Sequence, residues 1–410
     1  MVACRNFKNV LSLHGGLFAV AGAQAGVRHC SVWTRLFWVL CFPKIENCKE
    51  AILDTTAAAI LLFYFNSQTF MTSTVEAAAG DDIAVERSLF NSGLGSAPSC
   101  RNKSVPVIDM SQSDEAIRKQ MVDAAQSIGF FTVVNHGIPQ DLVDSTFQVA
   151  AEFFDQPLAE KKEQSPFASH LNSGFEFMSQ VRPSTGTADQ KETIQITARE
   201  EAMDKRWPTT PATFEKVTKM LMEEALKLAK RILTLLQEAA CPELDPPGLI
   251  ADSHELWGID GQCTLRLLHY PPIDKDTLAG LITPDGEGRI HWRAGPHTDW
   301  CNVTLLFQKQ AGLECCANPC VATEDTYWTP VDPMDGGIVV NIGDMLARWS
   351  DGKLHSNLHR VRMPKAEEGS RYSIGFFAQS NKSALIAPKN SPPMTAGEYI
   401  LSRIKSNFAQ

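Results

Sequence analysis

The sequence lacks several features that define common protein classes. Its two short apolar runs near the start, Leu36–Phe42 and Ala57–Phe65, are well below the roughly 20 residues that a transmembrane helix needs. Only 11 of the 410 residues are cysteine, without the even, close spacing of a disulfide-rich secreted domain. Basic residues do not cluster in the body of the chain, whose formal charge is −9. We therefore predict an intracellular protein with reduced thiols, no stable membrane insertion and no nucleic-acid partner.

The first hundred residues differ in composition from the rest. No acidic residue occurs before Lys44, although arginine and lysine recur there among Ser, Ala, Gly and apolar residues. Such a segment resembles an organelle transit peptide; the alternatives are a poorly ordered extension or a true start at Met71. Residues 1–100 are therefore predicted to be a leader outside the folded body, with Asn91–Ser99 as a linker. The predicted location is the cytoplasm, or an organelle if the leader is a transit peptide.

Helical periodicity dominates the first half of the body. A short strand at Val105–Asp109 precedes a helix capped by Ser113 or Asp114, and a buried strand is predicted at Phe130–Val134. Pro139 begins a second helix, and a long amphipathic helix is expected over residues 211–240. We therefore describe residues 101–255 as a helix-rich region.

From about Gly261 the pattern changes to short β-forming runs separated by turn residues. The expected strands are Cys263–His269, Val303–Phe307, Tyr327–Val331, Gly337–Asn341, Leu358–Met363 and Tyr372–Phe377. Such a series indicates a β-sandwich, barrel or jelly roll. The predicted fold is β-rich α+β, with a β core over residues 256–390 preceded and flanked by helices. A C-terminal helix or tail occupies residues 391–410.

One short motif suggests a metal site. On an extended strand, His297 and Asp299 would project from the same face and reach one ion together. His359 follows 60 positions after Asp299 at the start of an expected strand, which completes two histidines and one carboxylate. This set typically binds non-haem iron(II) and leaves coordination positions open. His355 competes for the third place, but the turn-forming residues before it favour His359.

A second motif suggests a carboxylate-binding site. Arg371 and Ser373 share a strand face, so a guanidinium with two parallel donors would lie beside a hydroxyl. This pair suits the distal acid of a dicarboxylate such as 2-oxoglutarate, whose keto-acid end would chelate the metal. The alternative for Arg371 is a buried ion pair with an Asp or Glu.

From Val105 to Pro388 the chain resembles the isopenicillin N synthase-like branch of the 2-oxoglutarate/iron(II) dioxygenase superfamily. The matching motifs are Val105–Asp109, Gly129–Ile138, Leu267–Pro272, His297–Asp299, Val339–Asp344, Leu358–Val361 and Arg371–Ser373. The resemblance implies a double-stranded β-helix preceded by helices.

The resemblance also implies roles for single residues. His297, Asp299 and His359 would be the iron ligands, and Arg371 and Ser373 would hold the distal carboxylate of the co-substrate. Tyr270 matches a tyrosine that helps to bind the co-substrate, with a packed core aromatic as the alternative. The chain departs from the family at Leu268, where an asparagine is often found.

The implied reaction uses iron(II), with 2-oxoglutarate and dioxygen as co-substrates and ascorbate as a candidate reductant. It would hydroxylate or desaturate a small organic molecule and release succinate and carbon dioxide, with no catalytic side chain beyond the metal ligands. Three alternatives stay open: an oxidase of the same fold that does not use 2-oxoglutarate, a non-catalytic binding module and a cupin-like barrel. Ser173–Met178 and His291–Arg293 are candidate substrate contacts.

Overall fold

The computed structural model describes residues 99, 104–182, 184–316, 327–365 and 367–408. The chain divides into two units, Met1–Thr72 and Ser73–Gln410, and every described residue lies in the second unit. The predicted leader, its two apolar runs, the alternative start and all of the linker except Ser99 therefore lie outside the described residues. Within the described part, no helix is both long and apolar enough to cross a membrane.

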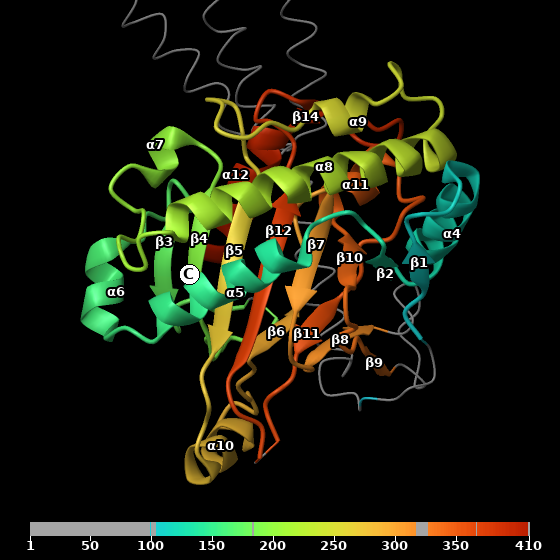
Figure 1. Cartoon of the computed structure of the whole chain (residues 1–410). Coiled ribbons are helices and arrows are strands. Elements are labelled where there is room, and N and C mark those ends of the chain that lie inside the picture. Colours follow the sequence, from blue (N-terminus) through green and yellow to red (C-terminus); the bar gives the residue numbers. More distant parts are fainter. Residues whose placement is uncertain (1–98, 100–103, 183, 317–326, 366, 409–410) are drawn as a thin grey trace, which may run out of the picture. The chain divides into compact units, whose positions relative to one another are not determined.

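Two sheets form the centre of the described unit. The larger sheet has eight strands in the order β1-β2-β10-β7-β12-β5-β4-β3, and the smaller has four in the order β6-β11-β8-β9 (Figure 1). Only β1 and β2 pair in parallel among these described strands. The strands of the larger sheet are β1 (Val107–Asp109), β2 (Phe130–Val134), β3 (Gly174–Phe177), β4 (Glu192–Thr197), β5 (Thr264–Tyr270), β7 (Val303–Gln308), β10 (Ile338–Ile342) and β12 (Arg371–Ala378). Those of the smaller sheet are β6 (Ala294–His297), β8 (Leu313–Cys316), β9 (Trp328–Pro330) and β11 (His359–Val361).

Three helices cover one face of the larger sheet: α4 (Asp114–Ser127), α5 (Gln140–Phe154) and α8 (Phe214–Ala240). In Figure 1, α8 and α5 run across the strands of this sheet. The buried stripe of α8 recurs every three or four residues, as an amphipathic helix requires. The other elements are α6 (Leu158–Gln164), α7 (Glu200–Met203), α9 (Leu249–Asp252), α10 (Lys275–Ile282), α11 (Asp344–Trp349), α12 (Ala396–Phe408), β13 (Leu385–Ile386) and β14 (Met394–Thr395).

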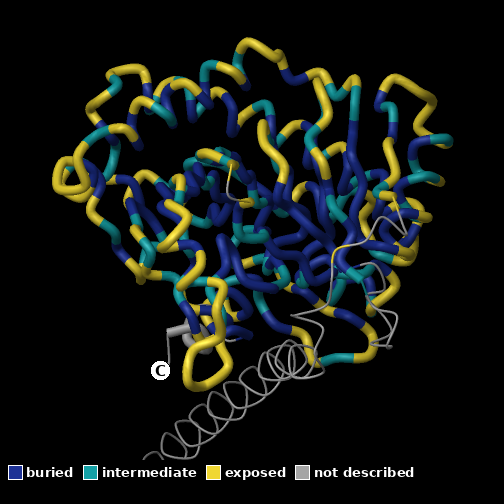
Figure 2. The backbone as a smooth tube through the Cα atoms, turned by 90° about the horizontal axis from the view of Figure 1, so that it is seen from below, coloured by how far each residue is buried: buried dark blue, intermediate teal, exposed yellow. Residues whose placement is uncertain are grey.

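Side chains of the larger sheet alternate between two buried environments. In β12, Ile374 and Phe376 belong to the main hydrophobic core under the helices, whereas Arg371, Ser373 and Phe377 line a pocket on the other face. The same alternation recurs in β5, β7 and β10. Figure 2 shows that the central strands are buried and that exposed segments lie at the periphery. One sheet face thus builds the core, and the opposite face builds the pocket.

The predicted fold class is confirmed, including the jelly-roll core flanked by helices. All six strands expected after Gly261 are present, with ends shifted by up to two residues. Among the described strands, β3, β4, β8, β13 and β14 were not predicted, and β6 was expected only as the extended segment that carries His297. All six residues of β4 are buried, including its four polar ones. The larger sheet draws strands from both predicted regions, 101–255 and 256–390.

Candidate functional site

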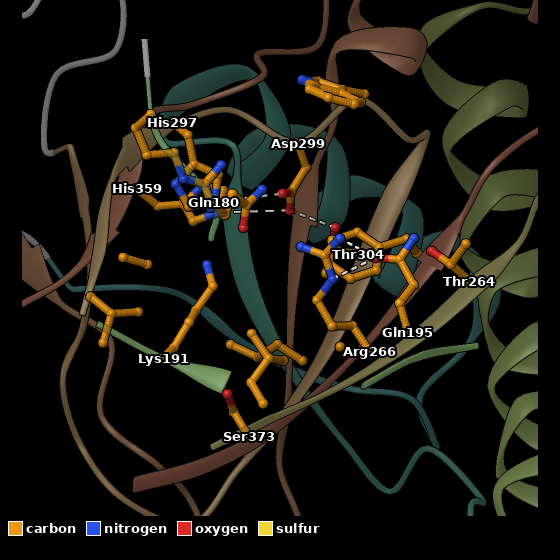
Figure 3. A pocket seen from close by; sticks show the side chains of 18 of the residues that line it. Gln180, Lys191, Gln195, Thr264, Arg266, His297, Asp299, Thr304, His359 and Ser373 are labelled. Carbon is orange, nitrogen blue, oxygen red and sulfur yellow. Dashed lines mark hydrogen bonds and ion pairs between the residues drawn. The ribbon is translucent and has the colours of Figure 1, made fainter. Parts of the chain in front are cut away.

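A cavity of about 320 Å³ lies on the pocket face of the larger sheet. Side chains from the two sheets line it, including Tyr270 and Arg371 from the larger sheet and His297 and His359 from the smaller one. Figure 3 shows how several of these side chains converge on the cavity. The sequence-predicted metal ligands and carboxylate-binding residues therefore share one pocket.

Strand pairing brings the two histidines together. His297 is the last residue of β6 and His359 the first of β11, and they are direct partners in this antiparallel pair. Their ring centroids are 4.3 Å apart. The expectation that Asp299 extends the same strand as His297 is wrong, because β6 ends at His297. Asp299 instead lies in the connection to β7, where its carbonyl accepts a hydrogen bond of 2.7 Å from the Asp344 amide.

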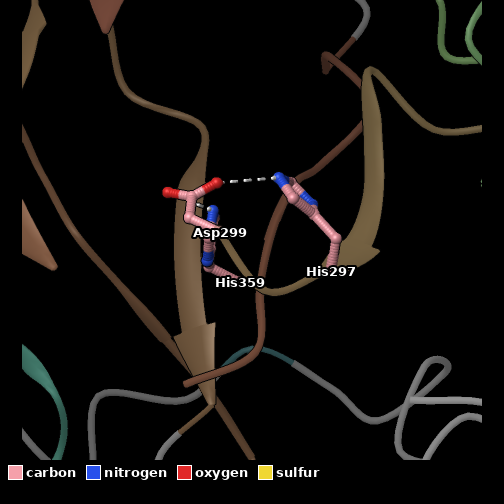
Figure 4. Close-up of side chains that lie close together, drawn as sticks. All are labelled: His297, Asp299 and His359. Carbon is pink, nitrogen blue, oxygen red and sulfur yellow. Dashed lines mark ion pairs between the residues drawn. The ribbon is translucent and has the colours of Figure 1, made fainter. Parts of the chain in front are cut away.

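The three side chains point at one small volume (Figure 4). Asp299 Oδ1 lies 3.9 Å from His297 Nε2, and Asp299 Oδ2 lies 3.7 Å from His359 Nε2. One ligand atom from each residue lies within 4.8 Å of the others, close enough to share an ion. Two imidazole nitrogens and one carboxylate oxygen are a donor set that suits non-haem iron(II). The competing His355 is not part of this group.

The ring nitrogens that face away from the site fix both imidazoles. His297 Nδ1 is 2.7 Å from the Gly295 carbonyl, and His359 Nδ1 is 3.2 Å from the Asn357 carbonyl. A carbonyl only accepts, so each Nδ1 carries the proton and each Nε2 keeps its lone pair for a metal. Burial, together with the nearby cations, also holds the pKa of His297 well below its usual value. His297 is thus prepared to act as a neutral ligand, and both rings present Nε2 to a metal.

Two further residues orient the carboxylate of Asp299. Thr304 Oγ1 donates a hydrogen bond of 2.7 Å to Asp299 Oδ2, and Asn341 Nδ2 donates one of 2.9 Å to the same oxygen. All three residues are buried. The sequence predicted no role for Thr304, and Asn341 was expected only as the last residue of the strand Gly337–Asn341. The available signal was one amide within the otherwise apolar strand Ile338–Ile342.

The carboxylate-binding motif lies on β12 and β5. Arg371 and Tyr270 are direct partners across these strands, and the guanidinium carbon is 4.9 Å from the ring centroid of Tyr270. Arg371 Nη1 donates to Ser373 Oγ at 3.1 Å, and its Nη2 donates to Gln308 Oε1 at 3.2 Å. Arg371 is only 1% exposed, yet within the described ranges none of the ion pairs involves it.

Among the described residues, the ion pair that was the alternative interpretation of Arg371 is absent. A buried guanidinium stays protonated and is costly to desolvate without a counter-charge. Burial does lower the pKa of Arg371, while the adjacent Tyr270 opposes that shift. The arrangement therefore suits an anionic ligand that enters the pocket, and it does not fit an internal ion pair.

A cationic wall that was not predicted from the sequence completes the pocket. It consists of Arg182 and Lys191, which line the cavity, and Asp189, which both contact. Burial lowers the pKa of Lys191 to about 8, and the attraction of Asp189 only partly offsets this shift. These residues lie outside the helices and strands expected from the sequence, so no periodicity marked them.

Other sequence expectations have mixed outcomes. Within Ser173–Met178, only Glu176 lines the cavity, because Phe175 packs against Phe153 and Phe154 in the core. His291–Arg293 does not line the cavity. Leu268, where the family often has asparagine, lines the pocket with an apolar side chain. His136 does not line the cavity, and its Nδ1 accepts a hydrogen bond of 3.1 Å from the Ile138 amide.

Comparison with known proteins gives consistent matches. A family model for the non-haem dioxygenase in morphine synthesis N-terminal region matches residues 105–214, and the model of the 2OG-Fe(II) oxygenase superfamily matches residues 261–380. UPF0676 protein C1494.01 of Schizosaccharomyces pombe is 32% identical over 320 residues, which cover 74% of this chain and 92% of that protein. Gibberellin 2-beta-dioxygenase 4 of Arabidopsis thaliana is 28% identical over 302 residues, which cover 72% of this chain and 86% of that protein.

Solved structures share the fold. A Neurospora crassa protein, in a crystal structure with alpha-KG and thymine, matches with a TM-score of 0.62 at 23% identity. The match covers 74% of this chain and 97% of that chain.

Proposed function

This chain belongs to the 2OG-Fe(II) oxygenase superfamily, and from that premise we propose that it hydroxylates or desaturates a small organic molecule at the pocket described above. It is an iron(II)- and 2-oxoglutarate-dependent dioxygenase, an oxidoreductase. In our proposal His297, Asp299 and His359 hold the iron, and Arg371, Ser373 and Tyr270 hold the distal carboxylate of 2-oxoglutarate. The proposal rests on one observation: the three ligand side chains converge, and each is oriented by a hydrogen bond from its other side.

The donor set fits iron(II) on its chemistry. Both Nδ1 protons are held by backbone carbonyls, so both Nε2 atoms are free to coordinate. The carboxylate of Asp299 is held from one side by two donors, so it is oriented before a metal binds. Bound iron, with 2-oxoglutarate and dioxygen, would supply the oxidising power that removes hydrogen from a substrate C–H bond.

The chain's own residues contribute binding and orientation. Arg371 offers parallel donors to the distal carboxylate, and the hydroxyl of Ser373, which accepts from Arg371, is free to donate its own proton to the same group. The phenol of Tyr270 lies beside this guanidinium. A co-substrate gripped at this end would extend along the pocket face toward the metal ligands. Apolar lining residues such as Leu268 and Phe130 reduce the access of water to the reacting atoms.

The test is an anaerobic titration of the full chain, freed of metal, with iron(II) and then with 2-oxoglutarate. Coordination of the keto-acid to iron produces a weak visible charge-transfer band. We expect the band in the wild-type protein, its loss in His297→Ala, and a requirement for at least tenfold more 2-oxoglutarate in Arg371→Met. Arg118→Met is the matched control, because the one ion pair of Arg118 with a described residue is the partly exposed pair with Glu238.

Each outcome has one meaning. If Arg371→Met and Arg118→Met both titrate like the wild type, the assigned carboxylate grip is wrong. If iron binds to the folded chain and no band forms at any 2-oxoglutarate concentration, an oxidase of this fold that does not use 2-oxoglutarate replaces the proposal. If His297→Ala binds iron as tightly as the wild type, the metal site lies elsewhere.

A further inference from the structure

The cationic wall, defined above as Arg182, Asp189 and Lys191, is built into the pocket beside the iron ligands. Asp189 Oδ2 is 2.9 Å from Arg182 Nε and 2.6 Å from Lys191 Nζ. All three side chains are at most 9% exposed. Asp189 Oδ1 accepts a hydrogen bond of 2.9 Å from the amide of Gly295, two residues before His297. The wall is therefore anchored to the strand that carries a proposed iron ligand.

Close packing keeps the wall in place. A Cβ added at Gly295 would lie 2.9 Å from Thr185 Cγ2 and 3.2 Å from Arg182 Cγ, so glycine allows this approach. Ser184 Oγ also donates a hydrogen bond of 2.6 Å to the Pro296 carbonyl. These contacts make the wall a built part of the site and fix its distance from the metal ligands.

The wall carries more positive charge than its own carboxylate neutralises. Arg182 and Lys191 share the single carboxylate of Asp189. The only side-chain hydrogen bond of Arg182 to a described residue uses Nε, so Nη1 and Nη2 have no protein partner in the described part of the chain. Arg182 lines the cavity while Asp189 does not, so a ligand in the pocket can reach the Arg182 side chain.

The rest of the pocket does not cancel this charge. Arg266 also lines the cavity, with its Nε donating to Gln195 Oε1 at 2.7 Å, and Glu176 is the acidic lining residue outside the metal site. Arg182, Lys191 and Arg266 thus stand against the two carboxylates of Asp189 and Glu176, which leaves one positive charge. A buried excess charge is costly unless a ligand compensates it.

The wall is separate from the co-substrate grip. The wall contacts the strand of His297 through the hydrogen bond from the Gly295 amide to Asp189, whereas Arg371 donates to Ser373 Oγ and Gln308 Oε1. In Figure 3 the amino group of Lys191 points toward Gln180 and the two histidines and away from Ser373. The excess charge therefore lies on the metal side of the pocket, where a substrate must present its reacting C–H bond.

We propose that the prime substrate is a small carboxylate whose anionic group binds to Arg182 and Lys191 on the cationic wall. The inference rests on the proposed function, because it places this group beside the iron site and assigns the Arg371 end to 2-oxoglutarate. A single negative charge matches the single excess positive charge. Two fixed cations would also set the distance from the anion to the metal, and so select which C–H bond reacts.

The experiment compares probes of equal shape and different charge. The full chain is saturated anaerobically with iron(II) and 2-oxoglutarate, and the visible band is followed during titration with phenylacetate or phenylacetamide, and with hexanoate or hexanamide. We expect each carboxylate to shift the band at concentrations at least tenfold below those of its amide, as a charged hydrogen-bonded pair requires. A probe that displaced 2-oxoglutarate would abolish the band, which separates the two sites.

Two variants test whether the cationic wall causes the preference for a carboxylate over its amide. In Arg182→Gln and in Lys191→Gln the preference for the acid over the amide should fall at least fivefold, with the 2-oxoglutarate titration unchanged. Lys227→Gln is the control, because the side chain of Lys227 is 70% exposed on α8 and its one ion pair with a described residue is the pair with Glu224. The wild-type comparison needs no variant, so a misfolded variant does not weaken the test.

Three results would overturn the inference in distinguishable ways. If the band forms normally and acids and amides act at equal concentrations, the substrate is not recognised by charge, and the proposed function stands without this inference. If no band forms with 2-oxoglutarate, the proposed function fails first and the inference fails with it. An unchanged acid preference in both wall variants would place the anion elsewhere in the pocket.

Discussion

Replacing Thr304 with valine tests how the protein prepares Asp299 for a metal. The side-chain hydroxyl of Thr304 donates the shorter of the two hydrogen bonds to Asp299 Oδ2, at 2.7 Å, against 2.9 Å for Asn341. Valine has nearly the same shape, so Thr304→Val removes one donor without leaving a cavity. Thr304 is 3% exposed, and water therefore cannot readily replace the lost donor.

The expected magnitude follows from the hydrogen bond. A hydrogen bond to a charged group contributes about 1.5–3 kcal/mol, and loss of a residue that orients a metal ligand typically costs about 10- to 100-fold in metal affinity. We expect Thr304→Val to bind iron(II) about 10- to 100-fold more weakly. Because Asn341 remains as the second donor, the variant should still bind iron at a high metal concentration.

The assay is an anaerobic competition between the protein and a coloured iron(II) chelator. Thr329→Val is the matched control, because the Thr329 hydroxyl is buried and has no hydrogen-bond partner among the described residues. This control should bind iron like the wild type, and its stability should be equal or slightly higher, since an unsatisfied hydroxyl is removed. Melting curves establish that both variants are folded.

Equal iron affinity in Thr304→Val and the wild type, within threefold, would refute the reasoning. Asp299 would then be oriented by its backbone alone or would not ligate the metal. A loss of the same size in Thr329→Val would show that any buried Thr→Val change disturbs the site, and the effect could no longer be assigned to Asp299.

Three further predictions follow from particular contacts. In Gly343→Ala a Cβ would overlap the backbone of the loop that carries Asp299, so we expect at least tenfold weaker iron binding. The space around Gly280 in α10 is open, so Gly280→Ala should instead raise the free energy of unfolding in urea by up to about 1 kcal/mol. Burial lowers the pKa of His254 to about 4, below the value of about 6.5 expected in the unfolded chain, so folding favours the neutral imidazole. The stability that this group contributes above pH 6.5 is therefore lost as the pH falls toward 4. Between pH 7 and pH 5 the wild type should lose about 2 kcal/mol more than His254→Gln, and equal losses would contradict the burial argument. Ser373→Ala should raise the KM for 2-oxoglutarate several-fold with little change in kcat, and an unchanged KM would remove Ser373 from the carboxylate grip.

Much of the fold was predictable because it follows from local periodicity. The stripe of α8 and the switch to short β-forming runs after Gly261 directly reflect which faces are apolar. The metal motif was also visible, since His297, Asp299 and His359 are a chemically distinctive set and converge as expected. The Arg371 and Ser373 motif was equally visible, and both side chains line the same cavity as the metal site.

Other features depend on long-range packing. Asp299 reaches the histidines from a connection, and its orientation is set by Thr304 and Asn341 on β7 and β10. The cationic wall joins Asp189 to the amide of Gly295 across 106 positions of sequence. No local pattern encodes these contacts, because each depends on which strands become neighbours.

The larger sheet shows why the sequence alone could not resolve the pocket. Residues such as Gln195 on β4 and Arg266 on β5 alternate with apolar neighbours in the same way as solvent-facing residues would. The alternation indicates that one face of these strands is polar, but it does not indicate whether solvent or another part of the protein covers that face. The sequence therefore determined the three helices that cover the larger sheet, the six strands expected after Gly261 and the chemically distinctive ligands. Only the packing of the smaller sheet over the larger one decided that the polar face is a buried pocket.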